Sequence, residues 1–339
     1  MKPRDLPRVE KLVEQWEPRL RRAFLESIYS VRGAAQLGAI VARLERGDVA
    51  GAVEALGLDP ARFLALDAAI ASAFAAGGSA TANAIPALRD ADGATLKVVF
   101  NIRNPVAEQW LRTESGTLIR EIVEDQRLMA RNALTAGLEA GVNPRTSALD
   151  LIGRINPATG LREGGSIGLT SQQEAWVRNY RAELQTLNPG ALDRKLRDAR
   201  FDASIRKAIE RGEPLSADKI DDIVRAYKNR ALRYRGENIA RTETLRALNQ
   251  SQGEATRQAV ERGQVQQSAI TKVWVSARDK RTRDTHRAMN GQEVPYEGRF
   301  RSPSGALLEY PNDANAPASE TVNCRCTVRY RIDFLRGIR

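Results

Sequence analysis

Apolar side chains recur at spacings of three and four residues through the first part of the chain, which is the period of a helix face. The clearest runs are Val9, Leu12, Val13 and Trp16, followed by Leu20, Phe24 and Ile28. This pattern predicts helices over residues 8 to 75. The stretch from Ala71 to Ala84 is dominated by Ala, Gly, Ser and Thr and ends before Pro86. It is predicted to be a linker.

Two further helix starts are marked by a capping residue followed by proline. The pairs are Asp59-Pro60 and Asn104-Pro105. Proline is favoured at the first helical position because the N–H that it lacks would have no partner there. The helix after Asn104 is predicted to continue to Gly137, with a break near Gly116.

Polar side chains mark two later helix starts. Thr170 with Gln173 has the spacing of a capping box, in which each residue bonds to the backbone N–H of the other. Ser216 and Asp218 begin the longest helical pattern, which runs to about Gly263. These signals predict a long helical body.

The pattern changes near Ile270. The run Lys272-Val273-Trp274-Val275 is β-branched and aromatic, and it is predicted to be a strand. A short helix is predicted from Asp279, as its N-cap, to Met289, with Asn290-Gly291 closing it. Residues 291 to 322 are rich in Gly, Pro, Ser and Asn, which predicts a long loop with a hairpin near Val294 and Phe300.

The chain ends in a second alternating pattern. Two sets of residues alternate, namely Cys324, Cys326, Val328, Tyr330 and Ile332 against Arg325, Thr327, Arg329 and Arg331. Successive side chains of a strand point to opposite faces, so both cysteines are expected on the core side and the arginines in water.

These elements together predict a mostly α protein with a C-terminal α+β module. The module is expected to hold short antiparallel strands around one short helix. The predicted divisions are an N-terminal helical region at 1–85, a helical body at 86–265 and the module at 266–339.

Composition adds a strongly basic surface to this fold. The formal net charge is +11 over 339 residues. Such a surface attracts polyanions, most often nucleic acid and sometimes an acidic protein. No apolar run of about 20 residues is apparent, so no membrane partner is expected. Two cysteines in a chain of this length argue against a disulfide framework and fit a reducing cytosol.

The rare side chains of the sequence gather in its last quarter. His286 is its only histidine, and Cys324 and Cys326 are its only cysteines. One imidazole and two thiolates are ligands that suit zinc, with Asp279, Asp284 or water as a fourth ligand. The second cysteine pair of a usual structural zinc site is absent from the sequence. Zinc is the only cofactor that these residues suggest, and the alternative interpretations need none.

One alternative is a small polar core without a metal. His286 would be satisfied by the helix dipole or by a nearby carboxylate, and the cysteines would be small buried groups. Arg241 and Glu243 on the long helix would then tie the body to the module. A strained disulfide between Cys324 and Cys326 is a further alternative.

Catalysis is a third alternative. His286 with either cysteine could form a nucleophilic dyad, although no positioned oxyanion hole is apparent beside it. A nucleic-acid hydrolase would use His286 as base and Glu243 as acid, with Arg241 or Arg283 on the phosphate. Whether the chain is an enzyme at all stays open at this point, with a non-enzymatic role favoured.

Basic residues of the module are candidates for contact with DNA. They are Arg278, Arg281, Arg325, Arg329 and Arg331. Few aromatic residues lie among them, so stacking on the bases of a single strand is not supported. The pattern favours contact with phosphates of double-stranded DNA without sequence preference, or a patch that faces an acidic protein.

The C-terminal sequence resembles the phage Mu F-like minor head protein family, also called phage head morphogenesis proteins. The matching pieces are Ile239-Ala240-Arg241-Thr242-Glu243-Thr244, Trp274, Asp279, His286, Gly291 and Asn323-Cys324-Arg325-Cys326. Weaker likeness upstream extends the resemblance to roughly residues 100 to 333. The residues expected to form the structural core of the module are Trp274, Asp279, His286, Asn323, Cys324 and Cys326.

The resemblance implies a minor capsid protein of a tailed phage or prophage. Such a protein would lie in the virion, in the head interior or near the portal, and in the host cytoplasm during assembly. Its expected partners are the portal and other head proteins, together with double-stranded DNA. Its expected role is to assist head morphogenesis and DNA packaging or delivery.

Overall fold

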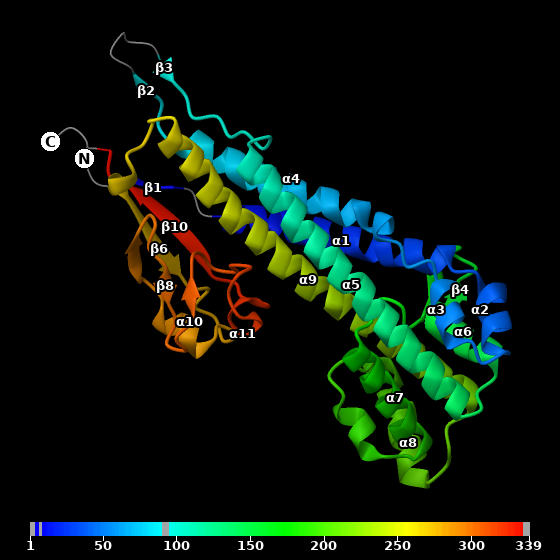
Figure 1. The fold of residues 1–339 in the computed structure, drawn as a ribbon. Coiled ribbons are helices and arrows are strands. Elements are labelled where there is room, and N and C mark those ends of the chain that lie inside the picture. Colours follow the sequence, from blue (N-terminus) through cyan, green and yellow to red (C-terminus); the bar gives the residue numbers. More distant parts are fainter. Residues whose placement is uncertain (1–3, 7–8, 90–94, 335–339) are drawn as a thin grey trace. The chain divides into compact units, whose positions relative to one another are not determined.

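The structure is a computed structural model that describes residues 4–6, 9–89 and 95–334 (Figure 1). Long helices form most of it, and short antiparallel strands gather toward the C-terminus. This confirms the predicted fold class, a mostly helical protein with a C-terminal α+β region.

The elements have the following bounds. The α-helices are α1 Glu10–Ala34, α2 Leu37–Leu44, α3 Val49–Glu54, α4 Leu64–Ala84, α5 Pro105–Glu139, α6 Pro144–Ile152, α7 Ser171–Gln185, α8 Asp202–Arg211, α9 Ala217–Glu261, α10 Asp284–Ala288 and α11 Ala318–Thr321. Short 3-10 helices are η1 Pro60–Phe63, η2 Pro189–Asp193, η3 Ala199–Phe201 and η4 Gln267–Ala269. The strands are β1 Arg4–Asp5, β2 Leu88–Arg89, β3 Thr95–Leu96, β4 Arg154–Ile155, β5 Arg162–Glu163, β6 Ile270–Val275, β7 Glu293–Pro295, β8 Phe300–Arg301, β9 Leu307–Leu308 and β10 Thr327–Ile332.

The helix starts that the sequence predicts are confirmed by their caps. The Oδ1 atom of Asn104 accepts a hydrogen bond from the Val106 N–H at 3.0 Å. Thr170 and Gln173 form both bonds of a capping box at the start of α7. The Ser216 hydroxyl accepts from the backbone of the first turn of α9. Each cap satisfies backbone N–H groups that the helix itself leaves unpaired.

Residues 71–84 are not a linker, because they form the C-terminal part of α4. Their small side chains serve close packing: a Cβ built on Gly77 would lie 2.2 Å from Ser251 Oγ and 2.9 Å from Leu248 Cδ2, both on α9. A Cβ on Gly78 would lie 2.3 Å from the Phe100 ring. Small residues in this run therefore permit a close helix–helix approach rather than flexibility.

Two further expectations were wrong: the break near Gly116 and the absence of a long apolar run. The α5 helix continues across Gly116 without the predicted break. Residues Pro60–Ala84 are long and apolar enough to span a membrane by length and composition, contrary to the expectation that no such run exists. A core helix passes the same test, and Leu66, Ile70 and Phe74 of α4 are buried within the protein.

The chain forms two compact units, each assembled from segments that are distant in sequence. The first comprises residues 1–22, 66–116 and 237–339, and the second comprises residues 23–65 and 117–236. The predicted division into three consecutive regions stays a prediction.

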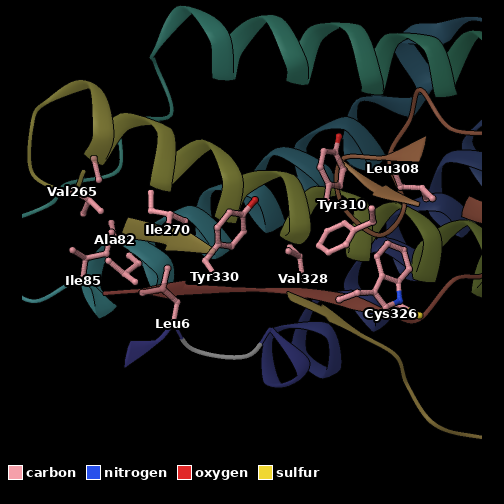
Figure 2. Packing of buried hydrophobic residues seen from close by; sticks show 14 of the residues in the cluster. Leu6, Ala82, Ile85, Val265, Ile270, Leu308, Tyr310, Cys326, Val328 and Tyr330 are labelled. Atoms are coloured by element: carbon pink, nitrogen blue, oxygen red, sulfur yellow. The ribbon is translucent and has the colours of Figure 1, made fainter. Parts of the chain in front are cut away.

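The first unit contains a four-stranded antiparallel sheet with the order β1-β10-β6-β7. The central pair aligns Val328 of β10 with Trp274 of β6. In Figure 2, Val328 and Tyr330 extend from β10 toward α9, whose C-terminal half covers this part of the sheet. The core they join also includes Leu6, Ile85 and Ile270. This layer of sheet and helix holds the C-terminal module in place.

Helices of the first unit pack around α9. Phe74 of α4 stacks on Trp110 of α5 with ring centroids 4.9 Å apart. Arg241 of α9 pairs with Glu17 of α1 at 3.0 Å. Arg246 of α9 also pairs with Glu114 of α5. Together with the glycine contact of α4, these pairs place α1, α4 and α5 against α9.

The second unit is built from helices and a glycine-rich loop. Arg32 is fully buried and donates to the backbone oxygens of Gly165 and Ile167, at 2.8 Å and 2.5 Å. Tyr180 of α7 packs on Tyr227 of α9 with ring centroids 4.6 Å apart. A buried guanidinium thus replaces the water that the loop carbonyls would otherwise bind.

Two local predictions in the C-terminal region were wrong. The short helix begins at Asp284, not at Asp279. The hairpin joins β8 to β9, whereas residues Glu293–Pro295 pair with β6 as an edge strand of the sheet. Both cysteines lie just before β10 rather than in it, but they are buried, as the alternation predicted.

Candidate functional site

Two segments that are far apart in sequence bring the rare side chains together. His286 lies on α10, and Cys324 and Cys326 lie between α11 and β10. Asn323 adopts a left-handed conformation, with φ of 58°, and so turns the chain just before Cys324. Asparagine tolerates this conformation better than most residues. The turn directs both cysteines toward α10.

Both sulfur atoms face one nitrogen of the histidine. The Nδ1 atom of His286 lies 3.3 Å from Cys324 Sγ and 3.5 Å from Cys326 Sγ. All three residues are at most 2% exposed. Trp274 covers the imidazole in an edge-to-face contact, with ring centroids 5.2 Å apart. The cluster is therefore a compact, dry group of one imidazole and two thiol groups.

A buried carboxylate holds the opposite side of the histidine. Glu320 Oε2 lies 2.7 Å from His286 Nε2. The other oxygen of Glu320 accepts hydrogen bonds from the hydroxyls of Ser302 at 3.1 Å and Ser304 at 2.6 Å. An ionised carboxylate can only accept, so Nε2 carries the proton. The lone pair of Nδ1 then points to the sulfur atoms.

Hydrogen bonds within the cluster shift the pKa values of Glu320 and of both cysteines. Burial raises the pKa of Glu320, but hydrogen bonds from Ser304, His286 and Ser302 outweigh it and leave that pKa below its usual value. The hydrogen bond from Cys324 lowers the pKa of Cys326 to about 5, and the same contact raises the pKa of Cys324. This contact therefore makes Cys326 ionise more readily than Cys324.

Neither predicted carboxylate belongs to this cluster. Asp279 accepts from the Arg281 N–H at 2.9 Å and pairs with Arg325 at 2.5 Å. It therefore stabilises the turn before α10 and is not the N-cap of that helix. Asp284 is 95% exposed and pairs with Arg287. Within the described residues the cluster consists of His286, Cys324 and Cys326, whose ligand atoms lie within 4.8 Å of one another.

Glu320 is the residue of the site that sequence reasoning missed. It lies in α11, four residues before Cys324 and only 4% exposed. A carboxylate in a Gly- and Pro-rich loop is ordinarily a surface residue. The available signal was its place at the start of the Glu320–Cys326 segment, in which both cysteines lie.

One face of the long α9 helix binds the chain before and after the two cysteines, from residue 311 to residue 328. The Asn323 N–H donates to the Thr242 hydroxyl at 3.1 Å. Arg246 donates to the Asn312 backbone oxygen at 3.1 Å. Asn249 donates to the Pro311 oxygen at 2.9 Å and accepts from the Val328 N–H at 3.2 Å. Residues 242, 246 and 249 are spaced by four and three positions, so they lie on one side of the helix.

The residues predicted to tie α9 to the module have other partners. Arg241 pairs with Glu17 of α1, and Glu243 pairs with Arg246. His286 uses both ring nitrogens within the cluster. None of these contacts links the three residues of the hydrolase alternative. That alternative stays a prediction without geometric support.

The basic candidates fall into two groups. Arg278 and Arg281 are exposed in the loop after β6, next to the exposed Lys280. Arg325 pairs with Asp279, and Arg331 pairs with Glu293 at 2.8 Å. Arg329 is half-buried and has a partner. The loop arginines are thus more available to an external anion than the strand arginines.

Comparison with known proteins identifies the region that carries the cluster. Residues 199–329 match the family model described as Phage Mu protein F like protein. The match spans α9, the cluster and β10 up to Arg329. Comparisons with curated proteins and with solved structures gave no match.

Proposed function

We propose that this chain, whose residues 199–329 match the family described as Phage Mu protein F like protein, acts in the head morphogenesis of a tailed phage or prophage. The family match is the observation that carries this function. The proposed protein is a minor capsid protein that lies near the portal and binds double-stranded DNA without sequence preference.

The architecture is consistent with a role in assembly rather than in chemistry. The cluster that resembles a reactive site is sealed: His286, Cys324 and Cys326 are each at most 2% exposed. A catalytic group must reach its substrate, and no side chain of this cluster does so from the surface. Its hydrogen bonds instead connect α10, α11 and the start of β10.

A deletion tests the role in morphogenesis. The gene is removed from the phage or prophage that carries it, and particles are examined by electron microscopy and by infectivity. Loss of DNA-filled infectious heads, restored by supplying the full chain, is expected. Normal yields of infectious particles without the protein would contradict the role.

The proposed location of the protein near the portal is tested by a separate measurement. Cross-linking followed by mass spectrometry on purified particles is expected to join this chain to the portal protein. Cross-links to tail proteins alone, or absence of the chain from particles, would contradict a portal-proximal site.

The DNA-binding part of the proposal rests on charge. The chain carries a net charge of +11, and Arg278, Lys280 and Arg281 are exposed in one loop. None of the described residues forms an ion pair with these three side chains. Several unpaired cations on one loop can contact adjacent phosphates, and such contacts release condensed counterions.

Salt-dependent affinity tests this part. Binding to two unrelated DNA duplexes of equal length is measured by fluorescence anisotropy over a range of salt concentrations. Both duplexes are expected to bind alike, with a steep fall of affinity on log–log axes. Reversing Arg278, Lys280 and Arg281 to Glu should make the slope shallower by roughly two to three units, since each phosphate contact contributes about 0.9.

A matched reversal controls for net charge. Arg206, Lys207 and Arg211 are exposed on α8. Their change to Glu alters the total charge by the same amount at a different place. If both triple variants weaken binding equally, the loop is not the DNA contact, and the binding is a property of overall charge alone.

A further inference from the structure

We infer that His286, Cys324 and Cys326 bind a thiophilic divalent cation, with zinc the natural candidate, and that this ion fastens α10 to the segment before β10. The inference goes beyond the role in head morphogenesis and does not depend on it. Four independent features of the cluster support it: donor type, donor spacing, orientation of the imidazole, and burial.

Donor type selects the class of metal. Two thiolates and one imidazole form a soft set that suits zinc, cobalt or cadmium and disfavours magnesium and calcium, which need oxygen ligands. The described residues offer no carboxylate within the cluster. Three protein ligands leave a fourth tetrahedral position for a water molecule or another donor.

Donor spacing fits a tetrahedral ion. Bond lengths of about 2.3 Å to sulfur and 2.0–2.1 Å to nitrogen place these two atoms about 3.6 Å apart around one tetrahedral centre. The observed separations from His286 Nδ1 are 3.3 Å to Cys324 Sγ and 3.5 Å to Cys326 Sγ. Both nitrogen–sulfur separations thus lie within a few tenths of an ångström of the distance that a tetrahedral ion requires.

The imidazole is already oriented as a ligand. Glu320 accepts the Nε2 proton at 2.7 Å, and Ser302 and Ser304 fix the carboxylate from its other side. Metal-bound histidines almost always donate their second N–H to such a partner, which fixes the tautomer and increases the basicity of the ligand nitrogen. The serine–glutamate–histidine series therefore directs the Nδ1 lone pair to both sulfurs.

Burial makes the cluster a structural rather than a catalytic site. Without an ion, the single Nδ1 lone pair can accept a hydrogen from only one of the two thiols. With a divalent ion, two thiolates and the cation form a neutral group, which a dry interior tolerates far better than separate charges. Trp274 lies against the imidazole, and Phe300 packs on the Trp274 ring with ring centroids 5.3 Å apart. Metal binding would therefore add directly to the stability of the module.

The test begins with the full chain, purified under a non-thiol reductant. Elemental analysis is expected to find about one zinc per chain. After removal of the ion, cobalt should produce thiolate-to-cobalt charge-transfer absorption and the intense d–d bands of a tetrahedral site. Adding zinc should abolish those bands and raise the melting temperature.

Variants assign the ligands. Cys324→Ser, Cys326→Ser and His286→Ala are each expected to remove the cobalt charge-transfer spectrum or reduce its intensity. Glu320→Gln should keep one ion per chain but bind it roughly 10- to 100-fold more weakly, because it alters the orienting partner and not a ligand. Asp284→Asn, at an exposed carboxylate of the same helix, should bind like the parent chain.

The full chain decides the outcome even if a variant fails to fold. Its two thiols should react slowly with a thiol reagent when zinc is bound and rapidly after chelation. A reduced, folded chain that binds neither zinc nor cobalt would overturn the inference. Recovery of Cys324 and Cys326 as a disulfide from freshly lysed cells, detected by a mass lower by two hydrogens, would also overturn it.

Discussion

Polar side chains on the long helices supply hydrogen-bond partners for backbone groups of the loops and strand ends that pack against them. Asn249 bonds to the Pro311 oxygen and to the Val328 N–H, much as a neighbouring strand would. Gln126 does the same for residues 168 and 169, accepting from the Gly168 N–H and donating to the Leu169 oxygen at 2.8 Å. Each of these amides uses one donor and one acceptor, so it satisfies one backbone C=O and one backbone N–H. Loops of this kind can be buried because the helices complete their hydrogen bonds.

Acid should weaken the protein through Asp198. The hydrogen bond from the Arg200 side chain lowers the pKa of Asp198 to about 2, with further help from the Arg200 N–H and Arg230. A depressed folded pKa contributes stability above the unfolded value of 3.8, and this contribution is lost as the pH falls toward 2. The free energy of unfolding should therefore decrease over that window.

Urea unfolding at a series of pH values measures this effect. Asp198→Asn should be less stable than the parent chain at neutral pH and should lose less stability on acidification. Arg200→Met, which removes the main partner, should change the pH dependence in the same direction. Parallel curves for the parent chain and Asp198→Asn would show that this ion pair has no influence on acid stability.

At the scale of elements, the contact of α4 with α9 depends on a glycine, which has no side chain to separate the two helices. Gly77 faces Ser251 and Leu248 so closely that a Cβ would lie 3.4 Å from the Leu248 Cα atom and nearer still to both side chains. Gly116 of α5 has open space around its Cβ position. Two helical glycines thus have opposite roles, one required by packing and one tolerated.

Alanine at these two positions should have opposite effects. Gly77→Ala should destabilise the chain by roughly 1–3 kcal/mol because the added methyl overpacks the interface. Gly116→Ala should stabilise it by about 0.5–1 kcal/mol because glycine costs conformational entropy in a helix. Thermal and urea unfolding measure both. If Gly77→Ala proved as stable as Gly116→Ala, the close approach would not constrain α4.

Secondary structure was predictable where the signal is local. The capping box at Thr170, the strand around Trp274 and the burial of both cysteines each depend on a short pattern of residue types. The run from Ala71 to Ala84 could not be assigned in this way. Its small residues resemble a linker, and only the surface of α9 explains why they form a buried helix.

The three clustered residues of the site could be predicted from the sequence, but the residues that orient them and hold the surrounding loop could not. His286, Cys324 and Cys326 are rare residues, so their clustering was visible in the sequence. Glu320 and Asn249 are common residue types whose roles depend on loop conformation and on α9. A prediction from pattern alone has no access to such contacts, since they join residues that are 34 and 79 positions apart.

At the scale of the whole molecule, the family boundaries do not coincide with a complete core. The match covers residues 199–329, but β10 continues to Ile332 and pairs with β1 near the N-terminus. The buried residues Ile85 and Tyr330 of the same core also lie outside it. The region that carries the family signature thus needs segments from both ends of the chain.

A fragment of residues 199–329 should therefore not fold cooperatively. It lacks α4, so apolar side chains of α9 such as Leu248 lose the helix that covers them. Its urea unfolding is expected to be broad, with rapid amide exchange in β6 and β10, whereas the full chain should unfold with a steep transition. A fragment with a steep transition and protected amides would show that the family region is an independent domain.

Pairing of Arg4 with Ile332 and of Asp5 with Arg331 has a consequence for synthesis. The first strand of the sheet cannot pair until residue 332 has been synthesised and has left the ribosome. Until then the backbone groups of Arg4 and Asp5 lack the partners that β10 supplies in the folded protein. Folding of this sheet therefore depends on a contact of very high sequence separation, which forms slowly compared with the local contacts of the helices.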